Sequence, residues 1–205
     1  MNVAIIGNGN VGVAVGQALG RCGHKVIFGV RSPAPGASNE STVPEAIRQS
    51  NATILAVPFA AVEDVIKSAG DLAGKVLIDA TNPLGMGDGA LGLTMGYATS
   101  GAEQIAAQAP GSLVFKAFNQ TGFENMANVR SYATRPVMFV AGDDPNGKQT
   151  VLTLVSDAGF DAVDIGGLRQ ARLLEPFAML WIELARKRGR GPNFTFSLQQ
   201  KGSTL

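Results

Sequence analysis

Short apolar runs of strand length alternate with longer segments of helical periodicity along most of the chain. The apolar runs predict strands over 3–6, 25–28, 53–57, 76–79, 113–115, 137–140 and 160–165. The periodic segments predict helices at 11–21, from about 42, 62, 100 and 145, and over about 169–189. This alternation is typical of a doubly wound α/β fold with a mostly parallel sheet. We expect a single domain over 1–205 that ends in the last helix and a short tail.

Capping residues mark three of the predicted helix starts. Thr42 with Glu45 and Ser100 with Glu103 both have the spacing of a capping box. Asp144 precedes a proline, which suits the first position of a helix.

Composition and charge then limit the class of protein. The chain has 45% apolar and 16% charged residues, which is enough apolar surface for a packed core. Its 17 basic residues nearly balance its 16 acidic residues, so we expect neither a nucleic-acid-binding surface nor a membrane-binding patch. The single cysteine, Cys22, excludes an internal disulfide framework and favours a reducing compartment, the cytoplasm. The uncharged N-terminal segment is broken by glycines and does not resemble a signal peptide.

A glycine-rich hexapeptide lies directly between the first predicted strand and the first predicted helix. It matches G-x-G-x-x-G and consists of Gly7, Asn8, Gly9, Asn10, Val11 and Gly12. In this pattern Gly7 makes the tight turn, Gly9 lets a diphosphate approach the backbone, and Gly12 allows close helix packing. The helix N-terminus then stabilises the phosphate charge. The position of the hexapeptide predicts a dinucleotide-binding Rossmann domain.

A second match to the same pattern has a different context. Residues 87–92 follow the turn at Asn82-Pro83 rather than a strand, and no clear helix follows them. The surrounding segment, residues 84–99, has no clear period, so we interpret it as a loop. Whether this loop covers the site as a lid is left open.

The end of the second predicted strand indicates which dinucleotide binds. Dinucleotide sites for NAD usually have an acidic residue there, which accepts a hydrogen bond from the ribose. This chain has Arg31 and Ser32 instead. A guanidinium and a hydroxyl suit a 2′-phosphate, and therefore predict NADP(H).

The carboxyl ends of the next strands should line the nicotinamide half of the site. These ends are Val57-Pro58, residues 79–83 and residues 116–119. They carry no strong acid–base pair, and the chain has no Ser-His-Asp set and no metal-ligand spacing. His24 is expected in a turn at the other end of the sheet, and Cys22 is expected to be inert.

Only weak catalytic candidates remain among these strand-end residues. Lys116 is one, although a structural or phosphate-binding lysine is the favoured interpretation, and Asn119 is the other. Asp79 is expected to cap the turn after its strand. Reduction of a carbonyl needs a proton donor, whereas a flavin-like ring carries most of its own chemistry. The absence of a strong donor therefore favours a flavin-like acceptor.

Several motifs together resemble the coenzyme F420-dependent NADP oxidoreductases, a group that also includes the oxidoreductase domain of six-transmembrane metalloreductases. They are residues 57–62 (VPFAAV), 79–84 (DATNPL), 141–144 (AGDD), 159–160 (GF) and 171–176 (ARLLEP). The resemblance implies a homodimer that binds NADPH and passes hydride to or from a deazaflavin or flavin. It implies a phosphate site over 8–12 and a 2′-phosphate site at Arg31 and Ser32. The residues that it implies on the nicotinamide side are Val57, Pro58, Asn82, Pro83, Ala117 and Asn119.

Two other functions remain open at this point. One is the reduction of a different small molecule bound under the glycine-rich loop. The other is a non-enzymatic module that binds NADPH and reports redox state.

Overall fold

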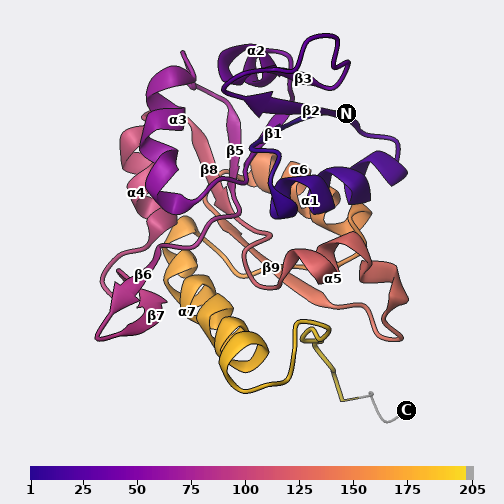
Figure 1. Ribbon diagram of the computed structural model, residues 1–205, viewed down its shortest axis with the longest axis vertical. Coiled ribbons are helices and arrows are strands. Elements are labelled where there is room, and N and C mark those ends of the chain that lie inside the picture. The colour runs from indigo at the N-terminus through magenta and orange to yellow at the C-terminus, as the bar shows by residue number, and fades with distance from the viewer. Residues whose placement is uncertain (202–205) are drawn as a thin grey trace.

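The computed structural model describes residues 1–201, which form an α/β fold around one large sheet (Figure 1). The eight strands lie in the order β10-β9-β8-β5-β4-β1-β2-β3. Their bounds are β1 (Asn2–Ile6), β2 (Lys25–Val30), β3 (Glu40–Thr42), β4 (Ala52–Leu55), β5 (Val76–Asp79), β8 (Leu113–Lys116), β9 (Val137–Gly142) and β10 (Asp161–Asp164). Every pairing between neighbours is parallel except that of β8 with β9. The predicted doubly wound, mostly parallel fold is confirmed.

Helices cover both faces of the sheet. They are α1 (Asn10–Arg21), α2 (Val43–Arg48), α3 (Val62–Ser68), α4 (Gly101–Gln108), α5 (Phe123–Ala127), α6 (Pro145–Asp157) and α7 (Ala171–Ile182). One apolar core lies under α1, α5 and α6, and a second lies under α2, α3 and α4. Both faces of the central strands are buried, which explains their continuous apolar runs. No helix within residues 1–201 is both long enough and apolar enough to span a bilayer.

The predicted side-chain capping hydrogen bond is present at two of the three helix starts. The Ser100 hydroxyl accepts from the backbone N–H of Glu103 at the start of α4, and Asp144 caps α6 by accepting from Gly147 N–H. Thr42 does occupy the N-cap of α2, but its side chain makes no capping hydrogen bond. Glu45 pairs with Arg48 one turn later instead, so the expected capping box is absent there.

The segment predicted to be an irregular loop forms a β-hairpin. Its strands are β6 (Leu84–Gly87) and β7 (Ala90–Leu93), joined by Asp88 and Gly89. Both turn residues have positive φ, +50° and +76°, as a two-residue hairpin turn requires. An Asp-Gly pair is a strong hairpin signal, but Gly85, Gly87 and Gly92 are poor strand formers and favoured the interpretation of this segment as a loop.

Helical turns run from Leu168 to Lys187 near the C-terminus, and the described part of the tail packs back against them. A 3-10 turn (Leu168–Gln170) precedes α7, and one π-helical turn (Glu183–Lys187) follows it. The tail then packs Phe194 against Trp181, whose indole N–H donates to the Phe194 carbonyl at 3.0 Å. The carbonyl of Phe196 accepts from Val137 N–H, which ties the tail to β9.

Strand β9 overlaps β8 only at two positions, where Phe115 pairs with Gly142 and Lys116 with Ala141. Beyond this overlap, the side-chain amide of Gln120 takes the place of a strand. It donates to the Phe139 carbonyl and accepts from the Phe139 N–H, both at 2.9 Å. The first half of β9 is thereby joined to the loop after β8.

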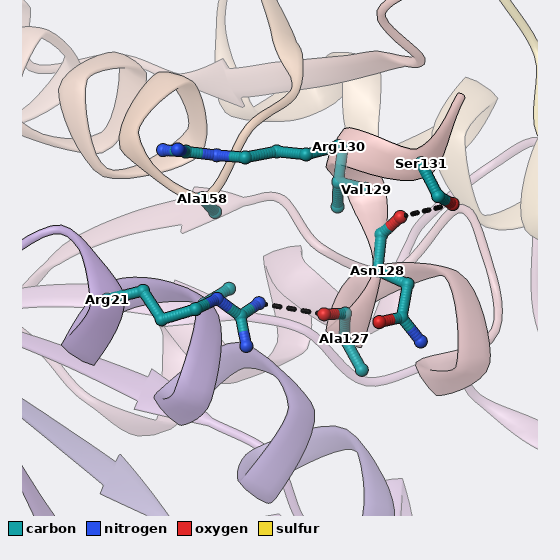
Figure 2. Close-up of a pocket in the computed structure, with 8 residues that line it drawn as sticks. Arg21, Ala127, Asn128, Val129, Arg130, Ser131 and Ala158 are labelled. Atoms are coloured by element: carbon teal, nitrogen blue, oxygen red, sulfur yellow. Dashed lines mark hydrogen bonds between the residues drawn. The ribbon is translucent and has the colours of Figure 1, made fainter. Parts of the chain in front are cut away.

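The far end of α1 is tied to α5. Arg21 in the last turn of α1 donates to the Ala127 carbonyl at 2.7 Å (Figure 2). Arg130 follows α5, and the two guanidinium groups border a hollow of about 270 Å³. This hollow lies at the end of α1 opposite to Gly7–Gly12.

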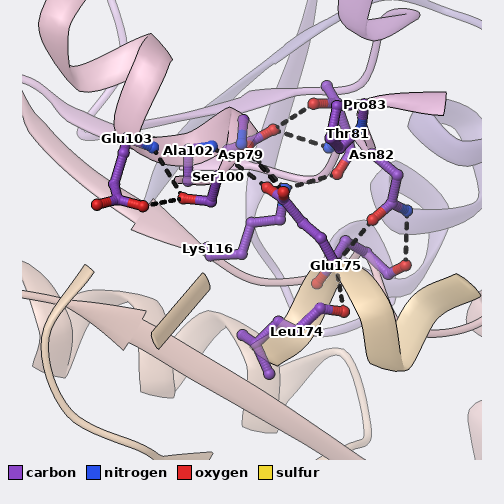
Figure 3. Close-up of polar contacts among 12 residues, drawn as sticks. Asp79, Thr81, Asn82, Pro83, Ser100, Ala102, Glu103, Lys116, Leu174 and Glu175 are labelled. Carbon is purple, nitrogen blue, oxygen red and sulfur yellow. Dashed lines mark hydrogen bonds and ion pairs between the residues drawn. The ribbon is translucent and has the colours of Figure 1, made fainter. Parts of the chain in front are cut away.

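A buried ion cluster joins the ends of β5 and β8 to two helices (Figure 3). Lys116 Nζ lies 2.8 Å from both Asp79 Oδ2 and Glu175 Oε1, and it donates to the Thr81 carbonyl at 2.7 Å. The side chains of all three charged residues are fully buried. Glu175, on α7, also accepts from the N–H groups of Gly101 and Ala102 at the start of α4. Asp79 and Glu175 thus share one ammonium, and the N-terminus of α4 compensates the second negative charge by binding Glu175.

We expect Lys116→Met to reduce stability strongly. Removing the ammonium leaves two carboxylates buried without their cation, and losing one partner of a buried pair costs about 3–5 kcal/mol. Urea unfolding measures the change. As a control, Lys67→Met removes an exposed partner of Glu63 and should leave the midpoint almost unchanged. Equal midpoints for both variants would contradict the assigned role of the cluster.

Candidate functional site

The carboxyl ends of four parallel neighbours, β1, β4, β5 and β8, meet at one edge of the sheet. The N-terminus of α1 lies at this edge because α1 follows β1 after a turn of only three residues. Ligands of doubly wound sheets bind outside this edge. The predicted phosphate loop at the start of α1 and the predicted nicotinamide-side residues at the strand ends therefore belong to one region.

Each glycine of the phosphate-binding pattern has the geometry that its predicted role requires. Gly7 has a φ of +105°, and a Cβ on Gly12 would stand 2.1 Å from the Gly7 carbonyl oxygen. Only glycine at both positions lets α1 start so close to β1. A Cβ on Gly9, by contrast, would meet no atom within 4 Å, and its φ of −75° is ordinary. Gly9 therefore faces open space in front of the helix.

The start of α1 is also free to bind an anion. Gly9 is the N-cap and offers no side-chain acceptor, so the first N–H groups of the helix have no capping side chain. Asn8, Gly9 and Asn10 are exposed at this point, and Val11 is half-buried. Exposed amides and a positive helix end are the components of a phosphate site.

A cleft of about 370 Å³ runs from this loop toward the end of β2. Gly7, Asn8 and Arg31 border it, and Val57 and Pro58 form part of its other wall with α3. The structure thus brings the predicted phosphate loop, the predicted 2′-phosphate reader and two predicted nicotinamide-side residues to one hollow. Ser32 is exposed beside Arg31, just outside the lining.

Sequence reasoning missed Glu40 at this site. Its carboxylate accepts from the Asn8 side chain at 3.3 Å and from Ala34 N–H at 2.9 Å. It thereby holds the loop after Arg31 against the phosphate loop. Glu40 lies in β3, a strand of three residues, which is too short to give a periodic signal.

The nicotinamide-side residues are held together by side-chain amides. Asn82 donates to the Asn119 carbonyl, and Asn119 donates to the Asn82 side-chain oxygen, both at 3.0 Å (Figure 3). Asn119 also donates to the Leu174 carbonyl on α7. Phe118, which directly precedes Asn119, has a φ of +60°. This left-handed conformation turns the chain just before the Asn119 amide. Such backbone strain occurs mainly at functional sites.

Four predicted residues lie below the surface of this edge, and Asn119 is one of them, with only 5% of it exposed. Pro83 is buried, and Ala117 is fully buried in the core cluster beneath the edge. Lys116 is fully buried in the ion cluster, so it has no surface from which to give a proton to an acceptor. This burial supports its structural interpretation over a catalytic role. Asp79 caps its turn as expected, by accepting from Thr81 N–H and Oγ1.

The residues expected to be uninvolved lie at the opposite edge. His24 is not a surface side chain, since only 6% of it is exposed and Nε2 lies 2.9 Å from Asp157 Oδ2. Cys22 ends α1, where its thiol contacts the Asp157 carbonyl and the Arg130 guanidinium. Both residues join α1 to the end of α6, far from the phosphate loop.

Two substitutions in the glycine pattern should affect different properties, one the NADPH affinity and the other the stability. Gly9→Ala adds a methyl group where no protein atom lies, so it should keep the melting temperature but weaken NADPH binding about tenfold or more by blocking phosphate approach. Gly12→Ala places a Cβ against the Gly7 carbonyl and should lower the melting temperature itself. Thermal melts combined with calorimetric titration separate these effects. Unchanged NADPH affinity in Gly9→Ala would contradict the proposed phosphate site.

Comparisons with known proteins agree with this geometry. Residues 2–83 match the family described as NADP oxidoreductase, coenzyme F420-dependent. The F420-dependent NADP reductase of Methanothermobacter marburgensis is 28% identical over 210 residues, covering 90% of this chain and 92% of that protein. The metalloreductase STEAP2 of Homo sapiens is 26% identical over 181 residues. That match covers 85% of this chain but 35% of STEAP2, so the chain spans about a third of the metalloreductase.

A solved structure extends the likeness to the whole fold. A candidate F420-dependent NADP-reductase from Arthrobacter sp. FB24 superposes with a TM-score of 0.86 at 28% identity, covering 98% of this chain and 100% of that one. A hypothetical protein from Sinorhizobium meliloti gives 0.73 at 27% identity, covering 83% and 88%. These matches confirm that the chain resembles the coenzyme F420-dependent NADP oxidoreductases, and they support an NADP-dependent oxidoreductase.

Proposed function

We propose that this protein transfers hydride between NADPH and a flavin-like acceptor, such as the deazaflavin F420, FMN or FAD. One observation carries the proposal: the uncapped start of α1 follows directly on Gly7 and Asn8, which border the same cleft as Arg31. A dinucleotide diphosphate fits the first position, and a 2′-phosphate fits the second. NADPH supplies the hydride, and the protein supplies binding and orientation.

The protein's own residues divide this work along the edge of the sheet. The N–H groups of α1 would bind the diphosphate, and Arg31 with Ser32 would bind the 2′-phosphate. Val57 and Pro58 border the cleft beyond the phosphate loop, where they would direct the ring end of the dinucleotide toward Asn82 and Asn119. Asn82 and Asn119 use their amides on one another, which makes that end of the site rigid.

The burial of Lys116 supports a ring acceptor over a carbonyl. An alkoxide that forms during reduction needs a proton donor within hydrogen-bond reach. The lysine at the carboxyl end of β8 is enclosed by Asp79, Thr81 and Glu175, and it cannot approach a substrate. A flavin-like ring needs stacking and orientation, and the edge held by Asn82 and Asn119 would help to orient it.

Two further features follow from the family resemblance as proposals. We propose a homodimer, to which the exposed Leu180 on α7 would contribute apolar surface. We also propose that the protein acts in the cytoplasm.

Anaerobic NADPH oxidation with F420, FMN and FAD as separate acceptors tests the proposed activity. Stoichiometric loss of NADPH with reduction of at least one ring is the expected result. Tight NADPH binding without turnover on any of the three rings would overturn the proposed activity and favour a redox-sensing module.

Arg31→Ala should change the preference between cofactors. Its charge-assisted contact with a 2′-phosphate is worth about 1.5–3 kcal/mol, which is roughly 10- to 150-fold in NADPH affinity. Affinity for NADH, which lacks that phosphate, should change little. Calorimetric titration of both cofactors measures the difference, and equal losses would contradict the assignment of Arg31.

Asn119→Ala should retain most of the hydride-transfer rate. In direct transfer between two rings no side chain exchanges a proton, so we expect a loss of less than about tenfold, whereas general acid–base catalysis supplies 10²–10⁴-fold. Single-turnover NADPH oxidation, corrected for the folded fraction, gives the rate. A thousandfold loss would identify Asn119 as a catalytic residue and contradict direct transfer.

A further inference from the structure

A hollow of about 410 Å³ lies outside the cleft assigned to NADPH. Two segments border it: the chain after the β6–β7 hairpin and the start of α7. Its lining residues are Tyr97, Ala98, Arg169, Gln170, Arg172 and Leu173. In Figure 1 the hairpin and the start of α7 lie on the left of the molecule, away from α5 on the right.

Tyr97 presents an aromatic ring to solvent from a strained backbone. It is 95% exposed, and its φ of +57° is a left-handed conformation. A tyrosine rarely adopts this conformation, and such residues gather at ligand sites. Leu173, across the hollow, is 62% exposed. The two side chains offer apolar surface that nothing within residues 1–201 covers.

The two arginines of the hollow differ in how they are engaged. Arg172 pairs with Glu103 through two hydrogen bonds, of 2.8 and 2.7 Å. The hydrogen bonds from Arg172 are the main cause of the lowered pKa of Glu103, and the charge of Arg169 adds to it. Arg169 is exposed and forms no ion pair with any described residue. Its guanidinium is therefore a cation available to a ligand.

A chain of contacts connects the hollow with the acceptor side of the proposed site. Arg172 is one helical turn before Glu175, about 4.5 Å along α7. Glu175 holds Lys116, which in turn binds the Thr81 carbonyl beside Asn82. Glu103, the partner of Arg172, lies next to Ser100 and Ala102 in the same view as these residues (Figure 3). One rigid cluster thus connects the hollow with the edge where hydride would pass.

We propose that this hollow binds the anionic group of the acceptor, a phosphate or carboxylate attached to a flavin-like ring. Arg169 pairs with the anion, and Arg172 is held in place by Glu103. Tyr97 and Leu173 contact the apolar part of the acceptor next to its anionic group. The proposal rests on the proposed function, which it extends from the ring to the group that the ring carries.

FMN and riboflavin form a matched pair of probes, because they share a ring and differ in one phosphate. Equilibrium binding to the full chain, measured by flavin fluorescence with NADP⁺ present, requires no turnover. The wild-type chain should bind FMN more tightly than riboflavin, and added salt should reduce the difference because the contact is exposed. Arg169→Gln should weaken FMN binding about five- to tenfold and leave riboflavin binding nearly unchanged.

Arg130→Gln is the control, since it removes the same charge just after α5, which lies away from the start of α7 (Figure 1). It should leave both affinities unchanged. Tyr97→Ala should weaken both flavins to a similar degree, because the ring contact is common to both.

Equal affinities of FMN and riboflavin for the wild-type chain, or no FMN binding, would overturn the proposal. An Arg169→Gln variant that changes the oligomeric state but not the FMN preference would also overturn it, and would identify a contact between copies. Failure of the proposed function is distinguishable: an Arg169-dependent FMN preference without NADPH oxidation would support the hollow but not the reaction.

Discussion

The enclosed charge triad of Lys116, Asp79 and Glu175 is the constraint on which the arrangement of the binding edge depends. A single ammonium fixes the ends of two adjacent strands, and its second carboxylate fixes the start of α4 against α7. The elements that build the acceptor side, namely the turn at Asn82, the loop at Asn119 and the first turn of α7, are placed by these contacts. An unpaired charge in this position would be costly, so the four elements form their contacts together or not at all.

The cofactor side depends instead on positions that have no side chain, namely the glycines of the phosphate loop. Gly7 and Gly12 bring a helix against a strand closely enough that its N-terminus points outward at the edge, and Gly9 leaves the space in front of it empty. Glu40 then joins the two loops that would contact the two ends of a phosphorylated ribose. The dinucleotide side is thus shaped by backbone, whereas the acceptor side is shaped by buried polar side chains.

Sequence patterns were sufficient for the features that depend on neighbours in the chain. Apolar runs located the strands of the main sheet except β3, and the context of Gly7–Gly12 located the phosphate loop. Contacts between residues that are far apart in the sequence could not be predicted from these patterns. Glu175 belongs to a motif but carries no sign that it would meet Lys116, 59 positions away. Glu40 contacts Asn8 across 32 positions. The strands of the hairpin at Asp88-Gly89 contain Gly85, Gly87 and Gly92, which are poor strand formers and favoured a loop instead.

The side-chain amide of Gln120 pairs backbone groups of β9 that have no neighbouring strand to bind. It satisfies both backbone groups of Phe139, one as donor and one as acceptor, at a place where β9 has run past the end of β8. A glutamate there is almost the same size, yet as a carboxylate it has no hydrogen to give. It would turn an oxygen toward the Phe139 carbonyl and leave that carbonyl unpaired in a half-buried position. A single change of nitrogen to oxygen would thus open a sheet edge beside the acceptor side.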